Sequence, residues 1–141
     1  MLAFGSCQQL KSVTLGPDTV SIGRYAFSEC VSLESFAVPS KVSVIQAGTF
    51  SGCTSLTAVS MPDGLKRVED KAFYDCSRLS GIGFGSGLEH IGEEAFCNCI
   101  NLASVTFREP QMTSIANYAF YKCTSLKAID IPGGVTGIGN Q

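Results

Sequence analysis

The 141-residue sequence has no tryptophan, one histidine and few charged residues, and it lacks a long hydrophobic run. No uninterrupted stretch reaches the roughly 18 apolar residues that a membrane-spanning helix needs, and no Lys- or Arg-led apolar segment at the start resembles a signal peptide. Only 16% of the residues are charged, and the net charge is -2. With this charge the chain has no positive electrostatic potential that would attract a polyanion. Nucleic acid and an anionic membrane surface are therefore not expected as partners.

The scarcity of histidine also limits catalytic chemistry. His90 falls in a segment where we expect a turn. A Cys-His nucleophilic pair would need a third group to orient the histidine and a pocket beside it. The spacing of the repeats brings no such residues together. The carboxylates Asp70, Glu93 and Glu94 leave two alternatives, a calcium site or a solvated charged edge, of which the charged edge is the commoner arrangement. We therefore predict a protein that is not an enzyme and has no cofactor and no metal.

What the sequence does contain is one pattern repeated six times. An Ala-Phe pair, replaced once by Thr-Phe, returns every 23 residues and once after 24, a period within the range of leucine-rich solenoids. A cysteine stands four residues after each Ala or Thr, a leucine three residues further on, and an alternating apolar pair follows. The phenylalanines are Phe4, Phe27, Phe50, Phe73, Phe96 and Phe120, and the cysteines are Cys7, Cys30, Cys53, Cys76, Cys99 and Cys123.

Each repeat predicts one short strand followed by a return segment. In Leu10-Lys-Ser-Val-Thr-Leu the second half alternates apolar and polar side chains, as a half-buried strand does. A proline soon afterwards ends the strand, because proline lacks the backbone donor. A second apolar group, such as Val42 and Ile45, then brings the chain back across the core. A glycine after such a group, as at Gly92, indicates either a positive φ angle or a close backbone approach.

These features predict an α/β-type repeat solenoid of about six coils of 23 residues, with mostly short parallel β-strands joined by turns or short helical segments. Stacking at the strand spacing of about 4.8 Å would place like residues over like, so the phenylalanines should form one internal column. Consecutive cysteines of the ladder would be near enough for disulfides. Their common direction, the odd total of seven and their apolar register instead favour reduced, buried thiols. The spacing of the cysteines matches no zinc signature.

The repeated pattern, Ala-Phe-x-x-Cys-x-x-Leu-x-x-Val-x-Ile-Pro-x-x-Val-x-x-Ile-Gly, closely resembles the BspA-type leucine-rich repeat over essentially the whole chain. The resemblance implies a solenoid of bacterial secreted and surface proteins and of some protist surface proteins, associated with adhesion and with binding of host proteins or other cells. It implies no catalytic residue. Both ends fall inside a repeat and lack a polar cap, so we expect residues 1–141 to be one solenoid domain cut from a longer array. The alternative is a short natural protein whose open ends are covered by self-association.

Two surfaces are candidates for binding. The first is the outward face of the predicted strands, whose side chains are small and include no aromatic residue: Ser12, Thr14, Ser35, Ser60, Ser104, Thr106 and Asp130. Binding hot spots favour Trp, Tyr and Arg, so this face suits a flat, weak or extended partner. The second surface lies beside the Ala-Phe turns and carries all four tyrosines, although tyrosines at such turns often only cover the rim of the core. They are Tyr25, Tyr74, Tyr118 and Tyr121.

Two departures from the repeat leave alternatives open. Cys97 stands where the other coils hold Gly, Ser or Tyr, a solvent-tolerant set, so we expect it to be the most reactive thiol unless it is a neutral substitution. Residues 108–112 hold one extra residue, which should bulge outward as a tolerated insertion or as a small recognition feature.

Taken together, the sequence predicts a non-catalytic module of a secreted or cell-surface protein that binds a protein or a glycan. The alternative function is a structural spacer or a self-associating scaffold with no dedicated ligand.

Overall fold

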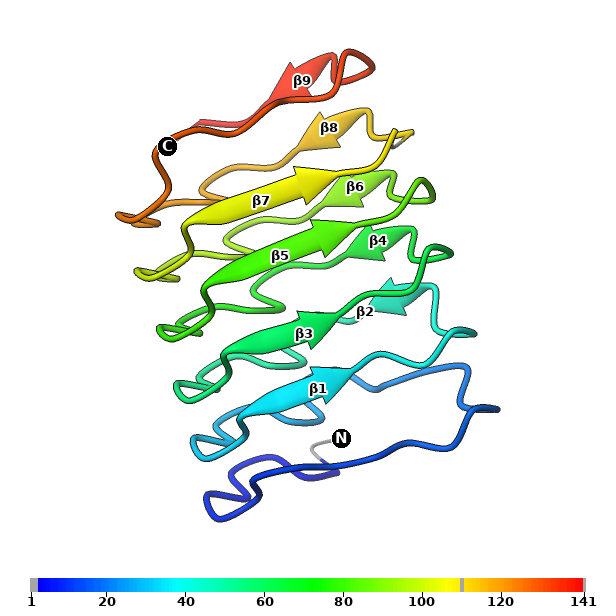
Figure 1. The fold of residues 1–141 in the computed structure, drawn as a ribbon, viewed down its shortest axis with the longest axis vertical. Helices are drawn as coiled ribbons and strands as arrows, with labels where there is room; N and C mark the ends of the chain where they lie inside the picture. The colour runs from blue at the N-terminus through cyan, green and yellow to red at the C-terminus, as the bar shows by residue number, and fades with distance from the viewer. Residues whose placement is uncertain (1–2, 110, 141) are drawn as a thin grey trace.

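The computed structural model describes residues 3–109 and 111–140, which form a solenoid of stacked coils (Figure 1). Each middle coil runs forward along one side and back along the other. The front strands are β1 (Ser35–Ala37), β3 (Ala58–Ser60), β5 (Gly81–Phe84) and β7 (Ser104–Phe107). The return strands are β2 (Val44–Ile45), β4 (Arg67–Val68), β6 (His90–Ile91), β8 (Ser114–Ile115) and β9 (Gly137–Ile138).

All pairings between these strands are parallel, as predicted. The return strands form one five-stranded sheet in the order β2-β4-β6-β8-β9, whereas the front strands form two separate pairs, β1-β3 and β5-β7. Each residue pairs with its equivalent in the next coil, as Ile45 does with Val68 and Val68 with Ile91. The register of the sequence repeat is therefore the register of the sheet.

One detail of the prediction was wrong. A middle coil contributes two strands rather than one, because the return segment is also extended and meets its equivalent in the next coil at hydrogen-bonding distance. Of the two expected kinds of connection, turns or short helical segments, the structure has turns: the parts of the chain that are described contain only strands, turns, bends and irregular segments. Within those parts, no helix is long and apolar enough to cross a membrane.

The phenylalanine column forms as predicted. Ring centroids of consecutive members lie 5.1 to 5.7 Å apart, and their planes differ by only 2° to 15°. The inner rings, from Phe27 to Phe96, are buried, while Phe4 at one end is 43% exposed. Since a buried Phe side chain contributes roughly 1.5 to 3 kcal/mol by transfer from water, this column is a main source of stability.

A ladder of thiols runs beside the rings, and all seven cysteines are free. The Sγ–H of each ladder cysteine from Cys30 onward donates to the backbone carbonyl of the phenylalanine in the preceding coil, at 3.1 to 3.2 Å. Burial raises the pKa of Cys53 and of Cys123 to about 12. From Cys30 onward the ladder cysteines therefore act as small buried groups that also join neighbouring coils, which is the structural role that their register predicted, whereas Cys7 is exposed.

In the described residues, the Ala-Phe turns use left-handed backbone at two places of the repeat. The first place precedes the Ala or Thr and has φ between 52° and 63°; it is occupied by Tyr25, Gly48, Lys71, Glu94 and Tyr118. The second precedes the cysteine and has φ between 57° and 75°; it is occupied by Ser6, Glu29, Gly52, Asp75, Asn98 and Lys122. At Gly92 the φ angle is not positive, so of the two explanations for that glycine the close backbone approach is correct.

Candidate functional site

The candidate residues of the strand face point outward, as the alternation of apolar and polar side chains predicted. Ser12, Thr14, Ser35, Ser60, Ser104, Thr106 and Asp130 are all exposed. Their neighbours across the sheet are equally small, because Ser104 pairs with Gly81 and Thr106 with Gly83. This face presents hydroxyl groups and backbone but no aromatic side chain that could anchor a partner.

The tyrosines are arranged differently. Three of the four, Tyr74, Tyr118 and Tyr121, border one depression of about 240 Å³ at the turn edge of coils four to six. We call this depression the tyrosine pocket; its lining residues are Tyr74, Glu94, Cys97, Asn98, Tyr118, Tyr121 and Lys122. The fourth tyrosine, Tyr25, lies far down the stack, and its ring covers Gly48, where a Cβ atom would overlap it.

Three equivalent positions in successive coils explain why the pocket exists. Tyr74, Cys97 and Tyr121 occupy the same place in coils four, five and six. Since coils repeat at about 4.8 Å, the two tyrosine backbones are roughly 10 Å apart, with the short cysteine side chain between them. The missing bulk at Cys97 leaves a gap between two large side chains.

Polar groups at the left-handed turn positions complete the walls. The Nδ2 of Asn98 donates to the hydroxyl of Tyr74 at 3.4 Å. The carboxylate of Glu94 lies 3.7 Å from the ammonium of Lys71. On the other side, the ammonium of Lys122 lies 5.4 Å from the centroid of the Tyr121 ring. The pocket therefore combines aromatic surface with donors and acceptors of both signs.

Tyr118 and Tyr121 form the exposed lip of the pocket. Their rings meet edge to face, with centroids 5.7 Å apart and planes at 81°. Both remain accessible, at 40% and 42% exposure. Aromatic side chains with this combination of a fixed neighbour and an open face are typical anchors of binding sites, because little rotamer entropy is lost on contact.

Cys97 is not the solvent-accessible thiol that its position predicted. It is only 5% exposed, although it lies among the lining residues of the tyrosine pocket. Burial raises the pKa of Cys97, and Glu94 adds to the rise while Lys122 and Lys71 oppose it. The exposed thiol is Cys7. The reactivity of Cys97 stays a prediction, but the exposure on which that prediction depended was wrong.

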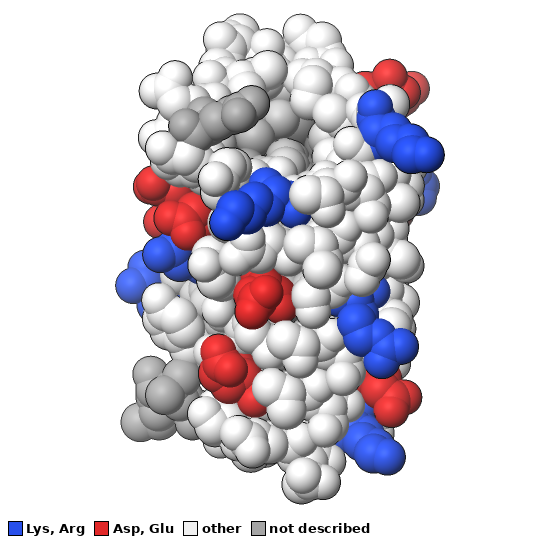
Figure 2. Space-filling model, turned by 90° about the vertical axis from the view of Figure 1, so that its left-hand side faces the viewer, with Lys and Arg blue, Asp and Glu red and all other residues white. Residues whose placement is uncertain are grey.

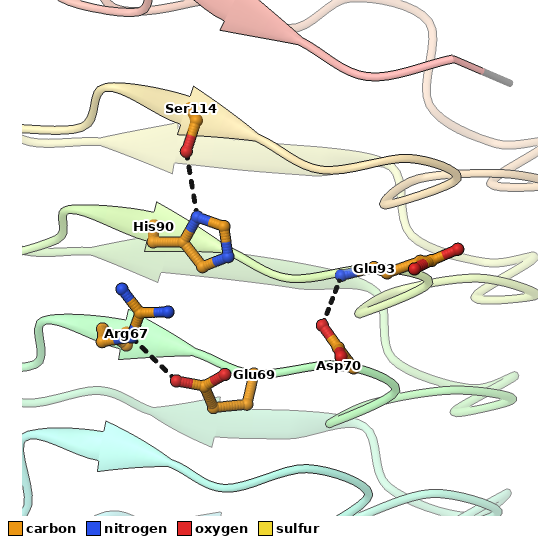
Figure 3. A network of polar contacts seen from close by, with 6 residues as sticks. All are labelled: Arg67, Glu69, Asp70, His90, Glu93 and Ser114. Carbon is orange, nitrogen blue, oxygen red and sulfur yellow. Dashed lines mark hydrogen bonds and ion pairs between the residues drawn. The ribbon is translucent and has the colours of Figure 1, made fainter.

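The polar residues near His90 have structural partners (Figure 3). His90 lies in β6 rather than in a turn, and its Nδ1 is 2.9 Å from the hydroxyl of Ser114. Asp70 accepts a backbone hydrogen bond from Glu93 at 2.8 Å. Among residues 3–109 and 111–140, no group of three or more His, Cys, Asp or Glu side chains has the arrangement to hold a metal ion.

The segment with the extra residue is partly described. Arg108, Glu109 and Gln111 are exposed, in keeping with the expected outward bulge, and Pro110 lies outside the described residues. Met112 returns to the core and is fully buried. The guanidinium of Arg108 lies 3.4 Å from the carboxylate of Asp63, an exposed pair that contributes little to stability.

Charged side chains of both signs are scattered over the turn edge. Figure 2 views the side of the solenoid where the turns lead from the return strands to the front strands, and most of the surface between these charges is uncharged. A larger depression of about 480 Å³ lies at the C-terminal end of the stack, lined by Phe120, Cys123 and Ile138 among others. A further coil of the same period would fill that space, so we assign no ligand to it.

Stacked 23-residue coils with an internal leucine, a cysteine ladder and parallel strands define a leucine-rich repeat solenoid. The chain belongs to the BspA type leucine rich repeat family, whose model matches residues 1–82 and 47–141 in six copies. No curated protein matches the sequence.

Solved structures share the fold. A leucine-rich repeat protein from Bacteroides ovatus superposes with a TM-score of 0.77 at 26% identity, covering 95% of this chain and 40% of its own. The T. pallidum leucine rich repeat protein gives a TM-score of 0.65 at 29% identity, covering 85% and 66%. A leucine rich cell surface protein from Faecalibacterium prausnitzii gives 0.64 at 24% identity, covering 97% and 52%, and that likeness shows the fold alone. The chain thus spans between 40% and 66% of these relatives' lengths.

Proposed function

We propose that this chain is a non-catalytic recognition module of a secreted or cell-surface protein, and that the tyrosine pocket is its main contact with a partner. The observation that carries the proposal is the gathering of Tyr74, Tyr118 and Tyr121 around one depression. Aromatic anchors in a partly enclosed site supply most of the energy in typical recognition surfaces. The family membership supports a surface role, since the family's known members include bacterial surface proteins.

The strand face is the second contact region in this proposal. Its small exposed side chains, such as Ser104 and Thr106, allow close approach of a flat partner but supply no anchor. We therefore assign it a supporting role.

Adhesion of beads coated with the chain to layers of bacterial or animal cells tests the proposal. We expect retention above that of uncoated beads, with a large loss for Tyr118→Ala and a smaller loss for Ser104→Arg. Tyr25→Ala is a matched control, because Tyr25 and Tyr118 are equivalent in the repeat, with φ of 54° and 56° and exposures of 43% and 40%.

The alternative function, a spacer or self-associating scaffold, makes a different prediction. It requires concentration-dependent oligomers in light scattering and no retention on any surface. A stable monomer that is retained through Tyr118 would exclude it.

A further inference from the structure

The shape of the tyrosine pocket restricts what it can bind. Its volume of about 240 Å³ lies below the range of about 300–1,000 Å³ that is typical of sites for drug-sized ligands. The gap over Cys97 lies between Tyr74 and Tyr121, two coils apart. A volume of this size suits a single ring that contacts the tyrosine side chains at its border, whereas a folded peptide segment would not fit.

The charges in and around the pocket exclude two further ligand classes. A cation would compete with the ammonium of Lys122, which already lies over the Tyr121 ring, and with Lys71, which lies 5.9 Å from the Tyr74 centroid. An anion would meet the carboxylate of Glu94. The lining therefore favours a ligand without net charge.

The lining also requires a ligand with two kinds of surface. Tyrosine rings present electron-rich faces, which attract weakly positive C–H groups. Glu94 offers carboxylate acceptors, Lys122 offers ammonium donors, and the Asn98 amide offers both. A purely apolar ligand would use none of the remaining hydrogen-bonding capacity of these groups, and a purely polar one would make no use of the tyrosine rings.

A sugar ring satisfies both requirements, because a pyranose has a C–H face and a rim of neutral hydroxyl groups. We propose that the tyrosine pocket binds one neutral hexopyranose unit of a glycan, with its C–H face on a tyrosine ring and its hydroxyls on Glu94, Asn98 and Lys122. This inference rests on the proposed function and names the partner class of the same site.

Titration of the ¹⁵N-labelled chain with single sugars tests it. The probes are the methyl glycosides of glucose, galactose, mannose and N-acetylglucosamine, followed by amide chemical shifts. We expect saturable shifts with at least one glycoside, confined to amides around residues 94–98 and 118–122. Tyr118→Ala should weaken this binding at least tenfold, and Tyr25→Ala should leave it within twofold.

A second variant tests the gap itself. Cys97→Tyr would restore the large side chain that coils four and six both carry at this position, so it should close the pocket and abolish the shifts. A circular dichroism melt verifies that the variant is folded. Should it not fold, Tyr118→Ala with its Tyr25→Ala control decides the matter.

Several outcomes would overturn the sugar assignment. One is the absence of saturable binding to all four glycosides and to a broad glycan array. Another is binding restricted to sulfated or sialylated glycans that depends on Lys122 but survives Tyr118→Ala. In either case the wider proposal would still stand if beads adhered through Tyr118 to cells whose glycans had been removed. The absence of adhesion to untreated cells, in contrast, would contradict the wider proposal itself.

Discussion

The Oδ1 atom of Asp70 accepts a hydrogen bond from the backbone N–H of Glu93, the equivalent residue one coil later, at 2.8 Å (Figure 3). Asn117 repeats this contact with Asn140, also at 2.8 Å. In each case the residue just before the donor is a glycine. The side chain of Asp70 or Asn117 thus occupies the space that a Cβ atom on the glycine of the next coil would need.

This arrangement predicts that Gly92 tolerates no substitution. A Cβ at Gly92 would lie 2.6 Å from Asp70 Oδ1 and 2.7 Å from the Asp70 backbone nitrogen, closer than real contacts. We expect Gly92→Ala to lower the free energy of unfolding by at least about 2 kcal/mol in a urea titration, because backbone must shift. Gly64→Ala is the control: nothing lies within 4 Å of its Cβ, so its effect should stay within about 1 kcal/mol. Equal effects of Gly92→Ala and Gly64→Ala would show that neighbouring coils are less tightly stacked at Gly92 than the structure indicates.

The phenylalanine column makes a prediction about position along the stack. Phe73→Ala should cost about 3–5 kcal/mol, since Phe73 is fully buried and stacks on Phe50 and Phe96. Phe4→Ala should cost clearly less, because that ring is 43% exposed and, among the described residues, stacks only on Phe27. Denaturant titrations of both variants measure the difference. Equal losses would be inconsistent with a linear stack in which each coil contacts only its neighbours.

The core of this fold was predictable because the period of the sequence is the period of the structure. Once coils are stacked, the 23-residue spacing alone places Phe50 over Phe27 and Cys53 beside Phe27. The outward position of Ser104 followed from simple alternation. These features depend on which residues recur, and recurrence is visible in a single sequence.

The turns were less predictable, since their geometry depends on contacts between coils. Left-handed backbone occurs at Tyr25, Lys71 and Tyr118, residue types that do not signal it, because hydrogen bonds to the next coil stabilise it there. The second strand of each coil was missed for a related reason: two residues are too few to show alternation. Only pairing with the next coil defines them as strands.

The candidate pocket could have been found from the sequence by comparing equivalent positions. Tyr74, Cys97 and Tyr121 share one place in the repeat, and a small residue between two large ones indicates a gap. From the sequence alone, the same substitution predicted an exposed thiol. Local polarity at the position suggested exposure to solvent, whereas the Cys97 side chain is only 5% exposed.

The thiol ladder predicts loss of stability at alkaline pH. Burial raises the pKa of Cys53 to about 12, above an ordinary thiol value of about 8.5. The folded state therefore retains a proton that the unfolded state releases, so stability is fully present below about pH 8.5 and falls as pH rises towards 12. For Cys53 alone the loss should be about 2 kcal/mol between pH 7 and pH 10.

Urea titrations at pH 7 and pH 10 of the natural chain and of Cys53→Ala test this expectation. All other ionisable groups are the same in the two proteins, so the difference between the two pH effects isolates Cys53. The variant should lose about 2 kcal/mol less than the natural chain on going to pH 10. An identical loss in both would mean that Cys53 is not held as a buried thiol.

Thiol accessibility distinguishes the structure from the sequence-based expectation about Cys97. Nucleophilic reaction requires a thiolate that the reagent can reach, and Cys97 is both 5% exposed and raised in pKa. We expect one thiol per chain, Cys7, to react quickly with a labelling reagent at pH 7.5, and the other six to react at least tenfold more slowly until the protein is unfolded. Cys7→Ser should remove the fast phase completely. If a fast phase survives in Cys7→Ser and disappears in Cys97→Ser, the pocket opens to solvent more widely than its lining allows, and Cys97 is the reactive residue after all.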